Sequence, residues 1–247
     1  MSEIENNRIQ QDAELDLSQE GFSLDELVKQ ERHKGEELEK HWSAQIKEIQ
    51  AGLFEYLGVS STDGLKEKME DIKQFPLGFF FPTYFGGHET TIQAEAGLAN
   101  ARCVITDDSG CVGERPLNVE SIINKVVNSR KTKNVVGIMW RSSLVNQYSM
   151  DLEHNGVWID DGIKGLGIGY GLYRLNEAVF GKQKTEVASK LSLLKLYLKL
   201  GFIPSAVVNP ISGEKLSRIE VGEVIKDCIK SGEEDIPLPI YLERGKQ

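Results

Sequence analysis

The chain has 247 residues, of which 40% are hydrophobic, so it can bury the core of one large domain or of one domain with an appendage. Its formal net charge of −9 at pH 7 argues against a general nucleic-acid-binding protein, whose binding surface needs a basic excess. The 3 cysteines are too few and too irregularly spaced for a disulfide framework or a zinc knuckle, which indicates reduced thiols in a cytoplasm.

Residues 1–20 are polar and acidic, and this composition predicts a disordered tail. The tail has neither the basic start nor the apolar run of a signal peptide. The apolar stretches of the chain fall short of the roughly 18 residues that a membrane helix needs. We therefore expect a cytoplasmic protein that does not bind membranes, while secretion by an unconventional route stays open.

A helical extension is predicted over residues 21–74. Its first helix runs from about Ser23 to Gly58, and a shorter one runs from Asp63 to Gln74. Apolar residues recur along the first helix at steps of three and four and so form one face, namely Trp42, Ile46, Ile49, Leu53 and Leu57. The many charges of this extension are interpreted as a solvated helix face rather than a binding site.

From residue 75 onwards, strand and helix patterns are mixed. The aromatic stretch around Pro76, Pro82 and the Gly86-Gly87 pair predicts extended or looping structure. Further strands are predicted within 101–110, 133–143, 155–161, 204–209 and 236–243. Helices are predicted over 118–130, 170–180, 189–200 and 219–230. This order of elements favours a mixed α/β or α+β domain over residues 75–247.

The segment "IDDGIKGLGIGYGLYRL", residues 159–175, contains four closely spaced glycines where a strand hands over to a helix. Glycine lets the backbone approach a ligand closely. The first N–H groups of a helix have no partner inside the helix, and its dipole adds partial positive charge there. Together these features predict an anion site, most often for phosphate, to which Lys164 adds a full positive charge.

Two phosphate-binding motifs do not fit this segment. A Walker loop requires Lys-Ser/Thr directly after its last glycine, whereas Gly169 is followed by Tyr170-Gly171. A dinucleotide-binding motif requires a third glycine three residues after the second. Tyr170 stands there if the motif starts with Gly165 and Gly167, and Arg174 stands there if it starts with Gly169 and Gly171.

The spacing Lys164-x-x-Gly167-x-Gly169 resembles the Arg/Gln-x-x-Gly-x-Gly/Ala motif of the GNAT acetyltransferase superfamily, in which the loop grips the pyrophosphate of coenzyme A. The segment "LYLKLGF", Leu196–Phe202, is similar to the signature that closes the next helix of that family. The clear resemblance covers about 157–203. It implies an α+β fold with a central, mostly antiparallel sheet flanked by helices, preceded here by the helical extension.

The resemblance also implies roles for individual residues. The backbone of Val157, Trp158 and Ile159 would pair with the pantetheine arm of acetyl-CoA. Tyr197 would donate a proton to the departing thiolate, for which a phenol is a suitable acid. The pyrophosphate would be bound by the loop residues Lys164, Gly165, Leu166, Gly167, Ile168, Gly169 and Tyr170. We see no cluster with metal-ligand spacing, and acyl transfer needs no metal.

Three positions depart from the family pattern. Lys164 keeps a positive charge but lacks the fork geometry of arginine. Asp161 stands where many members have proline, and as an acid it is mildly unfavourable beside an anion. Lys190 stands where many members carry an asparagine that helps to hold the donor, and Ser189 or Ser192 are candidate substitutes.

The motif does not fix the general base. By position the candidates are Glu153, His154 and Asp160, although His154 fits a surface histidine in a turn equally well. His88 and Glu89 could reach a site if the Gly-Gly loop folds over it, and a solvated loop is the alternative. Trp140 and Trp158 lie in strand patterns and are interpreted as core residues rather than as a substrate cage.

We therefore expect an acyl-CoA-dependent N-acyltransferase that moves an acetyl group from acetyl-CoA to an amine of a small molecule or a protein. The acidic chain suits a basic acceptor. The alternative is a non-catalytic member that binds CoA or a protein partner as a sensor or effector. A third interpretation is a host-directed or phage-type factor whose N-terminal helices bind a protein. Whether those helices form a homodimer stays open.

Overall fold

The computed structural model describes residues 23–71, 79–95, 100–107, 114–115, 117, 119–120, 134–143, 153–208 and 215–245. These residues form helices and two antiparallel sheets, which confirms the predicted mixed α+β class. The predicted tail at 1–20 and most of the helix predicted at 118–130 lie outside the described residues. The predicted domain boundaries after residues 20 and 74 stay predictions.

Contacts within the chain define two units. Unit 1 takes the chain up to His41 and from Gln183 onwards, and unit 2 is Trp42–Lys182. The long helix α1 (Leu24–Leu57) contributes to both units, and the short helix α2 (Thr62–Asp71) belongs to unit 2. Each unit is described by itself below.

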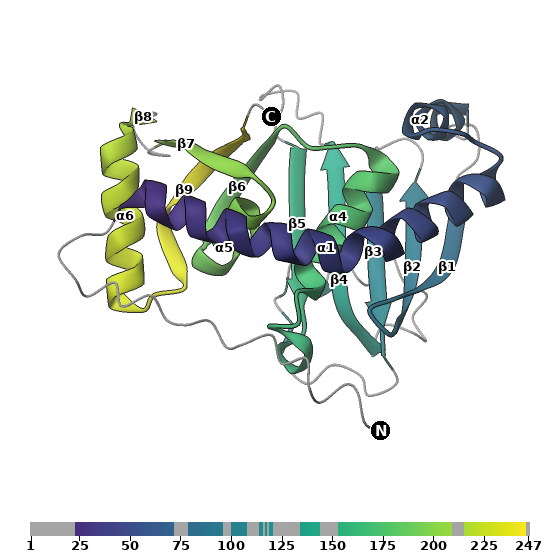
Figure 1. Cartoon of the computed structure of the whole chain (residues 1–247), viewed down its shortest axis with the longest axis horizontal. Helices are drawn as coiled ribbons and strands as arrows, with labels where there is room; N and C mark the ends of the chain where they lie inside the picture. The colour runs from purple at the N-terminus through teal and green to yellow at the C-terminus, as the bar shows by residue number, and fades with distance from the viewer. Residues whose placement is uncertain are drawn as a thin grey trace. The chain divides into compact units, whose positions relative to one another are not determined.

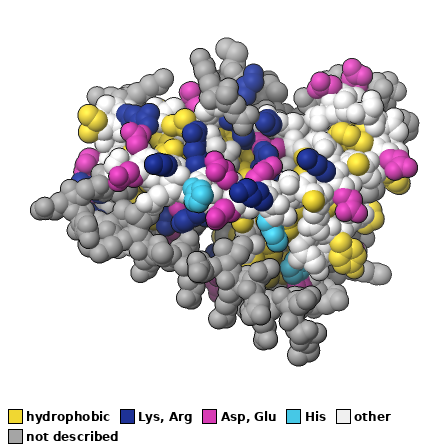
Figure 2. All heavy atoms as spheres, in the orientation of Figure 1, with side chains coloured by type: hydrophobic (Ala, Val, Ile, Leu, Met, Phe, Trp, Pro, Cys, Tyr) yellow, Lys and Arg dark blue, Asp and Glu magenta, His cyan; other side chains and the backbone are white. Residues whose placement is uncertain are grey.

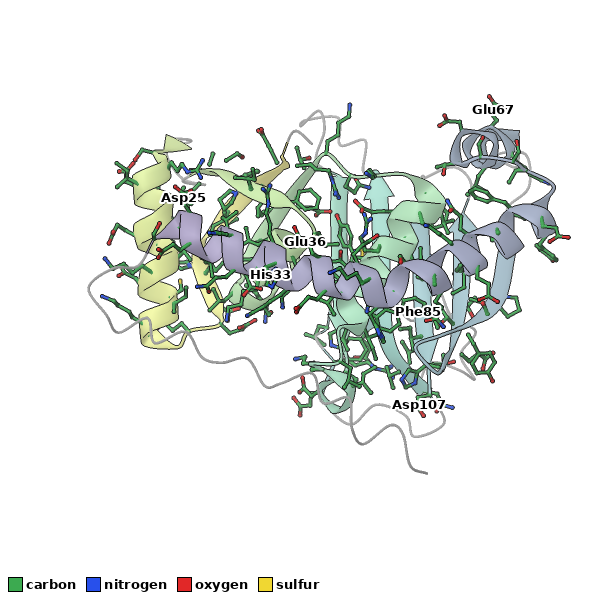
Figure 3. The ribbon with its side chains drawn as sticks, viewed as in Figure 1. Asp25, His33, Glu36, Glu67, Phe85 and Asp107 are labelled. Atoms are coloured by element: carbon green, nitrogen blue, oxygen red, sulfur yellow. The ribbon has the colours of Figure 1, made fainter. Side chains whose placement is uncertain are left out.

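The apolar face predicted for the first helix is buried, which confirms the prediction. In α1 its five residues are each at most 7% exposed, namely Trp42, Ile46, Ile49, Leu53 and Leu57. Charged residues occupy the outer face, where His33 and Glu36 lie one turn apart (Figure 3). On the face drawn in Figure 2, Lys and Arg side chains are interspersed with Asp and Glu side chains. This mixture fits the predicted solvated face.

Unit 2 contains a five-stranded antiparallel sheet with the strands in chain order (Figure 1). The strands are β1 (Phe79–Phe85), β2 (His88–Glu95), β3 (Asn100–Thr106), β4 (Val135–Ser143) and β5 (Glu153–Ile159). Gly86 and Gly87 join β1 to β2 in a two-residue turn, with φ angles of +59° and +83°. Positive φ at both positions is what a tight hairpin turn requires. The Gly-Gly segment is therefore a hairpin turn.

Helix α4 (Ile168–Phe180) packs against β3, β4 and β5 of this sheet. On the face of the sheet that α4 covers, Cys103 of β3 is hydrogen-bonded to Asn176 of α4. Burial raises the pKa of the Cys103 thiol to about 12, so it is an inert core residue. Trp140 and Trp158 pack against a buried cluster that includes Val104 and Ile138, as predicted for core residues.

Gly171 of α4 lies against Phe85 of β1 and Trp42 of α1. A Cβ atom added to Gly171 would lie 2.7 Å from Phe85 Cζ and 2.8 Å from Trp42 Cδ2. The rings of Phe85 (labelled in Figure 3) and Trp42 are stacked with their centroids 4.7 Å apart, and Phe85 is fully buried. The last of the four clustered glycines therefore serves close packing in the core of unit 2.

Unit 1 contains a four-stranded sheet in the order β6-β9-β7-β8. Its elements are β6 (Thr185–Lys190), α5 (Leu191–Lys199), β7 (Phe202–Val208), β8 (Lys215–Leu216), α6 (Arg218–Ser231) and β9 (Asp235–Arg244). The helix predicted at 189–200 is present as α5, but it begins two residues later because Ser189 and Lys190 end strand β6. Strand β6 itself was not predicted.

The first half of α1 packs against the end of α5 within unit 1. A Cβ atom added to Gly35 would lie 2.0 Å from the carbonyl oxygen of Lys199, so only glycine allows this approach. Glu31, one turn earlier, is buried and pairs with Lys34 at 3.0 Å and Lys199 at 3.4 Å. Glu31 is thus an exception to the predicted solvated face.

Among the described residues, none of the helices has the length and apolarity needed to cross a membrane.

We predict opposite effects from the same substitution at two glycines of α4. Gly171→Ala should lower the free energy of unfolding by about 1–3 kcal/mol, because the added methyl group must displace the stacked rings of Phe85 and Trp42. Gly169→Ala should leave it unchanged or raise it by up to about 1 kcal/mol, because alanine favours the helix. The added Cβ at Gly169 meets only Ile159 Cγ1, at an ordinary distance of 3.6 Å.

Urea unfolding followed by circular dichroism measures both variants. Equal destabilisation by the two alanines would contradict the packing role of Gly171.

Candidate functional site

The turn between β5 and α4 is organised by Asp160. Its backbone N–H donates to the carbonyl of Val136 at 2.7 Å, which continues the pairing of β5 with β4. Its buried carboxylate accepts a hydrogen bond from the N–H of Gly162 at 3.0 Å and so caps the 3-10 helix η3 (Asp161–Ile163). This carboxylate therefore shapes the turn, and its role as a general base stays a prediction.

Two of the four clustered glycines require a left-handed backbone. Gly165 has φ +82° and Gly167 has φ +71°. Side chains rarely adopt such angles, and glycine adopts them at little cost. Gly169 is inside α4, so the four glycines divide into two that make the turn and two that lie in the helix.

Helix α4 begins at a glycine that cannot cap it. Gly167 is the N-cap residue, and no side chain makes a capping hydrogen bond there. The N–H groups of Ile168 and Gly169 have no carbonyl acceptor inside the helix, and the helix dipole places partial positive charge at this end. This start of α4 is the feature that the sequence predicted to bind an anion.

The charge beside the turn is partly neutralised. Lys164 is 62% exposed, and its ammonium group forms an ion pair with the carboxylate of Asp161. Asp161, which stands where many GNAT members have proline, thus pairs with the positive charge that was expected to face the anion. Leu166 is exposed at the same turn.

Strand β5 is an edge strand of the five-stranded sheet. Its residues Val157, Trp158 and Ile159 pair with Met139, Ile138 and Gly137 of β4. An edge strand presents N–H and C=O groups on its other side, and an extended ligand can pair with them. The Trp158 ring packs on the core, with the Arg115 guanidinium 5.9 Å from its centroid, so the backbone of β5 is the part suited to a ligand.

Tyr197 of α5 is buried, with 1% of its surface exposed. Its ring contacts Phe202 edge-to-face, with centroids 5.8 Å apart. Burial and the hydrogen bond that its hydroxyl donates to the carboxylate of Glu186 hold the pKa of Tyr197 well above the ordinary tyrosine value. The phenol is therefore firmly protonated at neutral pH. It belongs to unit 1, whereas the glycine turn belongs to unit 2.

Glu186 is a functional candidate that sequence reasoning missed. It is buried in β6, where Glu186 and Ala188 face inward and Thr185 faces outward. An acidic residue at the inward position of an alternating segment is the signal that could have found it. The signal was not used because residues 185–190 were interpreted together with the leucine-rich helix that follows them.

The N-terminus of α5 is occupied by other parts of unit 1. The Glu234 carboxylate accepts hydrogen bonds from the backbone N–H of Ser192, at 3.1 Å, and from its hydroxyl. Lys190 pairs with Asp235 at 3.5 Å. In this structure Ser192 and Lys190 are thus engaged by neighbouring acids.

The remaining candidate bases lie in strands β5 and β2. Glu153 and His154 begin β5 and pair with Ser143 and Ser142, and their side chains lie outside the described part of the structure. His88 is the first residue of β2, directly after the hairpin turn, and its ring approaches Asp107. The Gly-Gly segment is not a long loop that folds over a site, because it is a tight hairpin.

An open groove of about 640 Å³ lies along the second half of α1 and the start of α2. It is lined by Lys47, Gln50, Ala51, Phe54, Glu55, Val59, Ser60, Ser61 and Thr62. None of these residues was predicted to belong to the site. The described residues contain no group of three or more His, Cys, Asp and Glu that could hold a metal ion.

The raised pKa of Tyr197 predicts how stability depends on pH. The unfolded chain loses this proton near the ordinary pKa of about 10, whereas the folded chain keeps it to higher pH. The free energy of unfolding should therefore fall as pH rises above about 10, by up to about 1.4 kcal/mol per pH unit from this group. Below that pH the contribution is complete.

Tyr197→Phe removes the titrating group and should flatten this part of the profile. Urea unfolding over roughly pH 9.5–11.5 compares the two proteins. The same slope in both would show that Tyr197 titrates normally in the folded chain.

The comparisons with known proteins give no family. No protein-family model matches the chain, and no curated protein or solved structure matches it either. Membership of the GNAT superfamily therefore stays a prediction that depends on the glycine turn and on the segment Leu196–Phe202.

Proposed function

We propose that the chain is an acyl-CoA-dependent N-acyltransferase of the GNAT type, with acetyl-CoA as the donor and an amine of a small molecule or a protein as the acceptor. One observation carries this proposal, namely the turn between β5 and α4. Positive φ angles at Gly165 and Gly167 expose the backbone at the start of α4, and no side chain caps the helix there. Such a helix start suits a pyrophosphate group.

The edge position of β5 supports the same proposal. Val157–Ile159 lead directly into the turn, so an extended ligand that pairs with β5 would carry its phosphates towards α4. The pantetheine arm of acetyl-CoA is such an extended ligand with a pyrophosphate at one end. In the proposed reaction the acceptor amine attacks the thioester carbonyl, which backbone N–H groups of β5 polarise. The resemblance to the GNAT superfamily would assign protonation of the departing sulfur to Tyr197.

A second candidate function is a non-catalytic protein of the same fold that binds CoA as a sensor or effector. The observation in its favour is the state of Tyr197, whose hydroxyl is buried and donates to Glu186. A phenol whose pKa is held well above that of a thiol, which is about 8.5, gives its proton to a thiolate only if it first leaves Glu186. Acetyl transfer to an amine distinguishes the two functions.

The proposal predicts that the purified protein binds acetyl-CoA with micromolar affinity in a calorimetric titration. Gly165→Glu should weaken this binding at least about tenfold, since a carboxylate is placed beside the pyrophosphate. Gly58→Glu is the matched control, because both glycines have positive φ (+82° and +65°) and an added Cβ meets no atom within 4 Å at either.

Equal loss of affinity in the two variants would contradict the glycine turn as the binding site. No binding by the wild-type protein at millimolar acetyl-CoA would contradict the proposal itself.

A further inference from the structure

The charge of the turn between β5 and α4 is carried by three side chains. Asp160, Asp161 and Lys164 are the acidic and basic residues of the stretch 159–171. The first turn of α4 contains no acidic residue. Two carboxylates therefore stand against one ammonium group at the place where the proposed function puts a pyrophosphate. The turn has no surplus of positive charge to offer this anion.

The two carboxylates differ in how firmly they are held. Asp160 is 1% exposed and accepts a hydrogen bond from the N–H of Gly162 at 3.0 Å, so its charge stays inside the turn. The side chain of Asp161 is 69% exposed and forms an ion pair with Lys164. The backbone N–H of Lys164 also donates to the carbonyl of Asp161 at 3.4 Å. The tight 3-10 turn thus brings the two side chains together.

A ligand can break the ion pair between Asp161 and Lys164. Both side chains are mostly exposed, and such pairs are weak because water screens the charges and both side chains lose freedom. The carboxylate of Glu31 in unit 1 is a contrast, since it is only 2% exposed and pairs with two lysines. A phosphate group carries more charge than a carboxylate, so the ammonium group of Lys164 gains by changing partner.

Lys164 lies next to the start of α4. It directly precedes Gly165, and the N-cap residue Gly167 is three positions further along the chain. An added Cβ atom at Gly165 meets no atom within 4 Å, so no protein atom fills the space beside this part of the turn. The lysine side chain is long and flexible, and rotation about its bonds moves the ammonium group away from Asp161.

The other acidic side chain described at this end of the sheet has its own partner. The carboxylate of Asp107, which directly follows β3, lies 3.1 Å from Nδ1 of His88 at the start of β2. Asp160 is committed to Gly162. Asp161 is therefore the exposed carboxylate of the turn that opposes an anion at the start of α4.

We propose that Asp161 sets the affinity of this site for its donor, because it holds Lys164 in the free protein and gives it up to the pyrophosphate on binding. This inference rests on the proposed function and concerns the same site. Binding has to break the ion pair, and it leaves the carboxylate of Asp161 unpaired beside a polyanion. Both effects weaken binding. The product CoA carries the same pyrophosphate, so Asp161 favours its release as well.

The first test is a calorimetric titration of Asp161→Asn with acetyl-CoA. The variant should bind about threefold to tenfold more tightly than the wild-type protein at low salt, since the competing charge is removed and the shape of the side chain is kept. Because the effect is electrostatic, the difference should shrink between about 50 mM and about 500 mM salt. Urea unfolding checks that the variant is as stable as the wild-type protein.

Asp25→Asn is the matched control for this titration. The carboxylate of Asp25 is 77% exposed and pairs with Arg218 at 2.6 Å in unit 1. The substitution changes the net charge of the chain by the same amount as Asp161→Asn. It should leave the Kd for acetyl-CoA unchanged.

The second test asks whether Lys164 changes partner. Lys164→Met should weaken binding more in the Asp161→Asn protein than in the wild-type protein. In the wild-type protein the gain from the phosphate contact is reduced by the loss of the ion pair, whereas in Asp161→Asn no ion pair has to be broken. The difference between the two losses measures the coupling of Asp161 and Lys164.

The outcomes are distinct. An unchanged or weaker affinity of Asp161→Asn overturns the inference and leaves the proposed function standing. Equal tightening by Asp25→Asn would trace the effect to net charge and overturns it as well. Equal losses from Lys164→Met in the two backgrounds would show that Lys164 does not change partner. Failure of the wild-type protein to bind millimolar acetyl-CoA overturns the proposed function, and this inference falls with it.

Discussion

The start of α4 is the constraint on which the rest of unit 2 depends. The turn that connects β5 to the helix requires positive φ angles at Gly165 and Gly167, which glycine adopts easily. The helix then packs against Phe85 of β1 at Gly171, where a Cβ atom would not fit. The first requirement exposes uncapped backbone N–H groups, and the second keeps the helix axis close to the sheet. Asp160 connects the two by tying the turn to β4. A helix held in this way presents a fixed N-terminal end, and the proposed function assigns the pyrophosphate to that end.

The candidate functional groups of the two units lie in different surroundings. In unit 2 the glycine turn, Asp160 and the His88–Asp107 pair lie at the same end of the strands of the sheet. In unit 1 the candidate acid Tyr197 is buried against Glu186, with its pKa raised. The buried, hydrogen-bonded phenol of Tyr197 is the feature that favours the non-catalytic function.

Sequence periodicity correctly predicted helices and strands whose buried residues recur at regular steps. It did not predict a short strand that runs directly into a helix. The three- and four-residue spacing from Trp42 to Leu57 identified the buried face of α1, and an apolar run rich in β-branched residues identified β4. Strand β6 was missed because only six residues separate its start from a leucine-rich helix, and Glu186 was missed with it. The His88–Asp107 pair joins residues far apart in the chain, so no local pattern reveals it. It follows from the register of β2 and β3.

A titration of the ¹⁵N-labelled protein with acetyl-CoA, followed through its backbone amide signals, shows whether the start of α4 binds the donor. If the pyrophosphate binds at the start of α4, the amides of Gly165, Gly167, Ile168 and Gly169 shift together in a saturable way, while those of Gly58 and Gly232 stay in place. Unchanged signals at the glycine turn, with acetyl-CoA either unbound or shifting amides elsewhere, would contradict the account. The turn would then serve only the packing of α4.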